Sequence, residues 1–105
     1  MANFLAASSD DRREPRQEVL HRTRLAQANG QERTVTIVNV SANGFMARAE
    51  GEWAAGDVLA VILPVIGLIK AEVRWALGGR LGCRLLRAIE LDDYEQMLQQ
   101  MLRSK

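Results

Sequence analysis

From about residue 18 the pattern of apolar and polar residues predicts a series of short β-strands rather than helices. The clearest segment is RTVTIVNV at 33–40, which is rich in β-branched residues and lies between two turn-type clusters. GFMARAE at 44–50 follows at once, which predicts a hairpin around residues 41–44. A preceding strand is expected to begin near residue 18.

Two later segments extend the strand pattern. DVLAVILPV at 57–65 is continuously apolar, which predicts a strand that is buried on both faces or is part of a closed barrel. RLGCRLLRAI at 80–89 is expected to form the last strand, after a tight turn at the two glycines 78–79.

The segment IKAEVRWAL at 69–77 alternates clearly between the two classes of residue. Strict alternation places four residues on one apolar side: Ala71, Val73, Trp75 and Leu77. This pattern favours core packing for Trp75. The arginines of the last two strands (Arg74, Arg80, Arg84 and Arg87) are interpreted as parts of solvated strand faces.

The period changes near the C-terminus. Apolar residues fall at 91, 94, 97, 98, 101 and 102, which predicts a helix over 91–103. Its apolar face is expected to cover an open mouth of the barrel or to meet a second copy of the chain. The fold class expected is therefore all-β, a six-stranded antiparallel β-barrel with a C-terminal α-helix, over residues 10–105. Residues 1–9 are expected to be a flexible N-terminal tail.

Composition excludes several kinds of site. The single cysteine, Cys83, permits no internal disulfide and is interpreted as a reduced core thiol, and the single histidine, His21, has no metal-ligand partners nearby. No Ser/His/Asp set or phosphate-binding P-loop is visible, so we expect no enzyme activity, no catalytic residues, no metal and no cofactor. The first residues lack the basic start of a signal peptide, and no apolar run approaches the length of a transmembrane helix. We therefore expect a cytoplasmic protein without a signal peptide or membrane insertion.

Charge argues against a nucleic-acid partner. The 105 residues carry a formal net charge of +1, and exposed aromatic candidates are scarce, so binding of DNA or RNA is not expected. Twelve of the fourteen basic residues are nevertheless arginine. The guanidinium group binds phosphate with two parallel hydrogen bonds and stacks on flat rings, so arginines are suited to contacts with both groups.

Two short motifs stand out together. One is Arg12-x-x-x-Arg16, before the first expected strand, and the other is Asn39-x-Ser41-x-x-Gly44, at the turn of the first hairpin. Each alone has an ordinary explanation: arginines four apart arise by chance in such a composition, and Asn-x-Ser near a glycine with positive φ is a common turn. In this order, and followed by this strand pattern, they resemble the PilZ domain family.

The resemblance covers residues 10 to 102. It implies a six-stranded antiparallel β-barrel with a C-terminal helix, in agreement with the pattern above, and a single-domain member of the family. It also implies binding of cyclic di-GMP, a bacterial second messenger that the family often holds as two stacked molecules. Pro15 restricts the residue before it to extended geometry, so the arginine motif is expected on a loop.

The resemblance also implies a role for each motif residue. Arg12 and Arg16 would contact the phosphates and the O6/N7 edge of guanine, and Arg13 would add a phosphate contact. Asn39 stands where aspartate is commoner in the family and would hydrogen-bond guanine less strongly.

The remaining site residues follow from the same resemblance. Ser41 would hydrogen-bond a guanine, and Gly44 would keep the loop tight. Trp75 resembles a tryptophan that touches the ligand at the barrel rim in some members, so ligand contact and core packing both stay open for it.

The function expected is a receptor that binds cyclic di-GMP and acts as a stand-alone adaptor on an unidentified downstream protein, as a monomer or weak homodimer. The alternative is a PilZ-like interaction module in motility or secretion that does not bind the nucleotide. A third interpretation, a small barrel that binds single-stranded nucleic acid, is disfavoured by the near-zero net charge.

Overall fold

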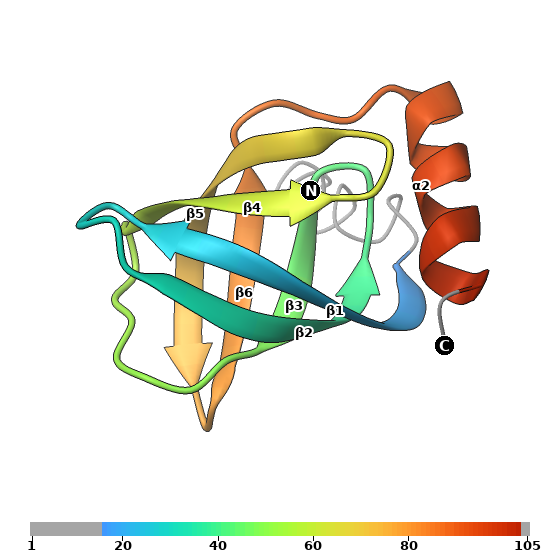
Figure 1. Cartoon of the computed structure of the whole chain (residues 1–105). Coiled ribbons are helices and arrows are strands. Elements are labelled where there is room, and N and C mark those ends of the chain that lie inside the picture. Colours follow the sequence, from blue (N-terminus) through green and yellow to red (C-terminus); the bar gives the residue numbers. More distant parts are fainter. Residues whose placement is uncertain (1–15, 104–105) are drawn as a thin grey trace, which may run out of the picture.

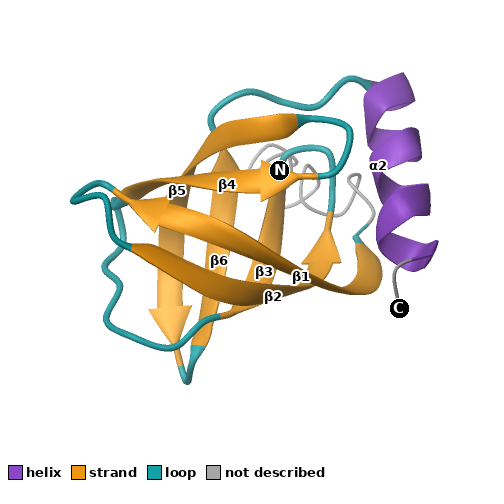
Figure 2. Cartoon of the chain, viewed as in Figure 1, coloured by secondary structure: helices purple, strands orange, loops and turns teal. Residues whose placement is uncertain are grey.

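The computed structural model describes residues 16–103, which form six strands and one helix (Figures 1 and 2). The expected N-terminal tail and the arginines Arg12 and Arg13 lie outside the described residues. The elements in chain order are β1 Gln17–Gln27, β2 Glu32–Val40, β3 Gly44–Arg48, β4 Val58–Leu63, β5 Gly67–Leu77, β6 Arg80–Leu85 and α2 Leu91–Arg103.

The six strands form one closed antiparallel barrel in the order β1-β2-β3-β6-β5-β4. Strand β1 pairs with both β2 and β4, which closes the sheet and leaves no long edge exposed. The glycines at 78 and 79 have φ values of 62° and 78° and join β5 to β6 in the tight turn that only such residues form easily. The predicted six-stranded barrel and the predicted helix bounds, 91–103, are both confirmed.

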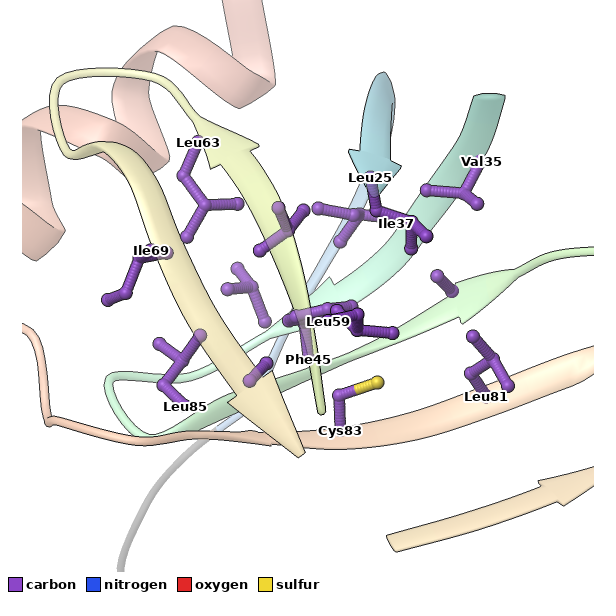
Figure 3. Packing of buried hydrophobic residues seen from close by; sticks show 14 of the residues in the cluster. Leu25, Val35, Ile37, Phe45, Leu59, Leu63, Ile69, Leu81, Cys83 and Leu85 are labelled. Carbon is purple, nitrogen blue, oxygen red and sulfur yellow. The ribbon is translucent and has the colours of Figure 1, made fainter. Parts of the chain in front are cut away.

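The barrel interior is filled by every second residue of each strand, as the alternation requires. Figure 3 shows Leu25 of β1, Ile37 of β2, Leu59 of β4 and Leu81 of β6 pointing into this common core. All four are at most 2% exposed. Burial of each such side chain contributes about 1.5–3 kcal/mol to stability, so the core fixes the barrel on which every surface site depends.

Helix α2 covers one mouth of the barrel and packs mainly on β1 (Figure 1). Met97 and Met101 are fully buried on its inner face, and the Tyr94 hydroxyl donates a hydrogen bond of 3.3 Å to the carbonyl oxygen of Val40. This arrangement confirms the expectation that the apolar face of the helix closes the barrel. The buried face of the helix is smaller than the apolar stripe predicted from the sequence, because Leu91 and Leu102 at the two ends of that stripe are exposed. No other helix occurs in residues 16–103, and α2 lacks the length and apolarity that crossing a bilayer requires.

The continuous apolar run of 57–65 does not give a strand buried on both faces. Leu59, Val61 and Leu63 point into the barrel, whereas Val58 and Ile62 are exposed on its outer surface. The other interpretation of this run, a strand in a closed barrel, is correct.

The predicted faces of 69–77 are wrong beyond Val73. On β6, Cys83 opposes Val73 and the next residue, Gly82, opposes Trp75, so β5 carries one extra residue in a β-bulge. The bulge reverses the alternation that follows it. Trp75 and Leu77 therefore lie on the outer surface, and core packing for Trp75 is excluded.

Cys83 is buried in the barrel, as the sequence predicts. Burial raises the pKa of its thiol to about 12, so roughly one molecule in ten thousand carries the reactive thiolate at pH 8. We expect iodoacetamide at pH 8 to alkylate the native protein at least about 100-fold more slowly than the protein in denaturant. Equal rates in the two states would contradict the buried position.

Candidate functional site

The described part of the first motif and the second motif meet at one end of strands β1, β2 and β3. Gln17, the first residue of β1, pairs with Val40, the last residue of β2, and this pairing holds Arg16 beside the following turn. A surface hollow of about 380 Å³ forms there. It is lined by Arg16, Ser41, Asn43, Gly44, Phe45, Arg74, Trp75, Gly82, Cys83 and Arg84.

The turn between β2 and β3 is held by its own hydrogen bonds. The Ser41 amide donates to the Gly44 carbonyl at 2.9 Å, and the Asn43 amide donates to the Ser41 hydroxyl oxygen at 3.3 Å. The Leu85 amide donates to the Asn43 carbonyl at 2.8 Å, which ties the turn to β6. Ser41 is only 7% exposed, so its position is set by this network before any ligand arrives.

Gly44 serves the turn through space rather than through φ. It is absent from the positive-φ glycines of the described chain, so the positive φ expected for it is wrong. A Cβ atom at this position would lie 2.4 Å from the backbone oxygen of Cys83, well inside van der Waals contact. Only glycine therefore allows β3 to begin this close to β6, and the close approach shapes the floor of the hollow.

The aromatic wall of the hollow is Trp75, which packs against the backbone of Gly82. A Cβ atom on Gly82 would lie 2.1 Å from the indole Nε1, so the indole occupies the space that any larger residue would fill. The side chain is 42% exposed. The bulge and the glycine together present an aromatic ring to the hollow.

Asn39 lies on β2 near the hollow but does not line it. Its Nδ2 contacts the Met46 sulfur at 3.9 Å, a weak interaction. Its Oδ1 is buried and has no hydrogen-bond partner among residues 16–103. An unsatisfied buried acceptor costs about 1–3 kcal/mol, which a donor on a ligand would recover.

Two further arginines of the hollow, Arg74 and Arg84, were assigned to ordinary solvated strand faces from the sequence. Arg84 pairs with Gly44 across the β3–β6 ladder, and Arg74 lies next to Trp75 at the bulge. The Arg74 guanidinium is 3.9 Å from the Glu72 carboxylate, a weak and exposed ion pair. With Arg16 these side chains give the hollow three guanidinium groups. Arg74 lies on β5 and Arg84 on β6, and their predicted outward-facing positions were the sequence signal that could have pointed to this role.

The seven predicted site residues divide into three groups. Arg16, Ser41, Gly44 and Trp75 line the hollow together. Asn39 stands beside the hollow, and Arg12 and Arg13 lie outside the described residues. No cluster of three or more potential metal-ligating side chains occurs within residues 16–103.

Comparison with known proteins assigns this chain to a family. The family model for the PilZ domain matches residues 10–104. The chain belongs to the PilZ domain family. No curated protein matches it.

Two solved PilZ domains share the fold. The PilZ domain of CeSA from a cellulose-synthesizing bacterium is 13% identical, with a TM-score of 0.61, and the match covers 86% of this chain and 97% of that one. The PilZ domain of Escherichia coli YcgR, solved with cyclic di-GMP, is 16% identical, with a TM-score of 0.52 and coverage of 88% and 91%. Because these identities are low, the similarity to the two solved domains establishes only that this chain has the PilZ barrel fold. The ligand has to be inferred from the chemistry of the site.

Proposed function

We propose that this PilZ domain binds cyclic di-GMP in the hollow at the β2–β3 turn. The observation that carries the proposal is the meeting of Arg16 with Ser41 and Gly44 in one hollow, because Arg16 is at least 25 positions from either residue in the chain. Membership in the PilZ family and the YcgR domain solved with this nucleotide support the choice of ligand.

Three guanidinium groups suit the phosphates of this ligand. Cyclic di-GMP carries two phosphate charges, and each can accept two parallel hydrogen bonds from an arginine. Arg16, Arg74 and Arg84 line the hollow from separate strands or strand ends, so they can approach a bound molecule from different sides. In this proposal Arg12 and Arg13, which precede Arg16 in the chain, add contacts to phosphate and to the O6/N7 edge of guanine.

A guanine base fits the other groups of the hollow. The exposed indole of Trp75 offers a flat face for stacking, and base–aromatic stacking contributes about 1–3 kcal/mol. In this proposal the Asn39 side chain turns toward the hollow, where its unsatisfied Oδ1 accepts from the N1–H or N2–H of guanine. The Ser41 hydroxyl can donate to a guanine acceptor.

The role proposed for the bound form is that of a cytoplasmic adaptor. In this role the nucleotide acts by changing a surface that the domain presents to a downstream protein. Arg16 lines the hollow, so in this proposal the nucleotide that it holds there forms part of the surface that the downstream protein meets.

Calorimetric titration of the purified protein with cyclic di-GMP tests the binding claim. We expect a dissociation constant below about 10 µM, with GMP at the same concentration binding at least about 100-fold more weakly because it cannot place two phosphates in one hollow. Absence of heat with tens of micromolar cyclic di-GMP would contradict the proposal.

A second candidate function is an interaction module that does not bind the nucleotide. The outer face of the β4–β5 hairpin favours it, since Val58, Ile62 and Leu68 are exposed there, where a solvated sheet face is ordinarily polar. For this candidate, Arg16→Ala would leave the capture of a downstream protein unchanged in the presence of cyclic di-GMP. For the receptor it would abolish any effect of the nucleotide on that capture.

A further inference from the structure

A second basic surface lies on the outer face of the barrel, away from the motif turn. The strand registers place Arg22, Thr36, Arg48, Arg80 and Leu77 opposite one another in a single row across β1, β2, β3, β6 and β5. Each of these residues has buried or half-buried neighbours in its own strand, so its side chain points outward. We call this row the arginine row.

The arginine row is not the nucleotide hollow. The β3–β6 ladder begins with the pair Gly44 and Arg84 and ends with the pair Arg48 and Arg80. The two ends of β3 are four positions apart along the strand, or about 13 Å at strand spacing. Neither Arg48 nor Arg80 lines the hollow at the motif turn, so the two surfaces are separate.

The charges of the arginine row are not balanced within the described chain. The guanidiniums of Arg22, Arg48 and Arg80 form no ion pair with any carboxylate of residues 16–103. Arg48 and Arg80 oppose each other directly across the ladder, and like charges in that position destabilise a sheet. The nearby Glu32 already pairs with Arg24. Among the described residues, the row therefore lacks its countercharge.

A groove runs along the row, with a volume of about 890 Å³. Four arginines line it, the three of the row and Arg33, against two carboxylates, those of Glu32 and Glu50. The groove thus carries an excess of positive charge.

We propose that this groove binds an acidic segment of a partner protein. The row from Arg22 to Arg80 crosses three strand spacings, about 14 Å, which matches four or five residues of an extended chain rather than one small anion. Leu77 at the end of the row is 80% exposed and offers an apolar contact that an inorganic anion does not use. The lining contains no aromatic ring for base stacking, which argues against a nucleic acid.

The groove gives a stand-alone adaptor the partner contact that its proposed role requires. The strand register and the charges of the groove do not depend on the nucleotide, so the groove is tested without cyclic di-GMP. Failure of nucleotide binding would leave this proposal standing, and failure of the groove would leave the nucleotide site standing.

The probe is a labelled eight-residue peptide of glutamate with two leucines, followed by fluorescence anisotropy in 50 mM salt. We expect saturable binding that weakens at least about 10-fold in the variants Arg48→Glu and Arg80→Glu, and that weakens also in 0.5 M salt. The matched control is Arg87→Glu, an exposed arginine outside the groove, for which affinity should stay within about twofold of wild type.

Thermal unfolding separates loss of binding from loss of fold. Arg48→Gln relieves the repulsion from Arg80, so its melting temperature should equal or exceed that of wild type while its affinity for the peptide falls. Absence of peptide binding by the wild type would overturn the proposal. So would a loss of peptide affinity in Arg87→Glu as large as that in Arg48→Glu and Arg80→Glu. Binding of inorganic tripolyphosphate, but not of the peptide, would overturn it in favour of a small-anion site.

Discussion

Replacement of Arg16 by alanine is expected to weaken the binding of cyclic di-GMP by at least about 100-fold. Arg16 is the one described arginine of its motif, and it lines the hollow beside Ser41 and Gly44. Removal of a charged side chain that makes two parallel hydrogen bonds to phosphate costs about 3 kcal/mol of binding free energy. This cost corresponds to a dissociation constant roughly 150-fold higher. Calorimetric titration of both proteins measures this ratio.

The fold itself should not respond to that change. Arg16 is exposed and precedes the first residue of β1, so its removal should leave the melting temperature within a few degrees of wild type. Arg87→Ala removes the same charge from an exposed position outside the hollow and should bind like wild type. An affinity of Arg16→Ala within threefold of wild type would refute the role of Arg16 in binding.

Gly44→Ala is expected to lower the free energy of unfolding by about 3 kcal/mol. Its Cβ would lie 2.4 Å from the Cys83 backbone oxygen, and a backbone atom in a ladder cannot move aside without breaking the pairing of β3 with β6. For a domain of this size the loss corresponds to a melting temperature lower by roughly 10–20 °C. Urea unfolding followed by tryptophan fluorescence gives the free energy.

Gly30→Ala is the matched control for that prediction. Gly30 has a φ of 89°, and a Cβ atom added there would meet no other atom within 4 Å, so alanine brings backbone strain without a clash. We expect a smaller loss, about 1 kcal/mol. Equal losses for the two variants would show that close approach to β6 is not the reason for glycine at 44.

The barrel and helix could be predicted because each follows from local periodicity. The two-residue period of RTVTIVNV and the change of period at residue 91 both depend on neighbours in the sequence. The bulge at Trp75 could not be predicted, since it is a property of how β5 pairs with β6. One extra residue there turned a predicted core side chain into a wall of the site.

Of the candidate site, the sequence predicted the residues of the two motifs and Trp75 but not the arginines that other strands contribute. Ser41 and Gly44 were found from a local turn pattern, whereas Arg84 enters the hollow because β6 lies beside β3. The same adjacency brings Arg48 against Arg80, which are 32 positions apart in the chain. Strand order across a closed barrel is a long-range property, and a single sequence does not display it.

The central claim is that cyclic di-GMP binds at the β2–β3 turn, and amide chemical shifts measured during a titration test it most directly. We predict that the largest shifts occur at Ser41, Asn43, Gly44 and Arg84, together with the indole N–H of Trp75. The amides of the arginine row should change little. Absence of shifts at the turn, or larger shifts at Arg48 than at Gly44, would contradict the claim.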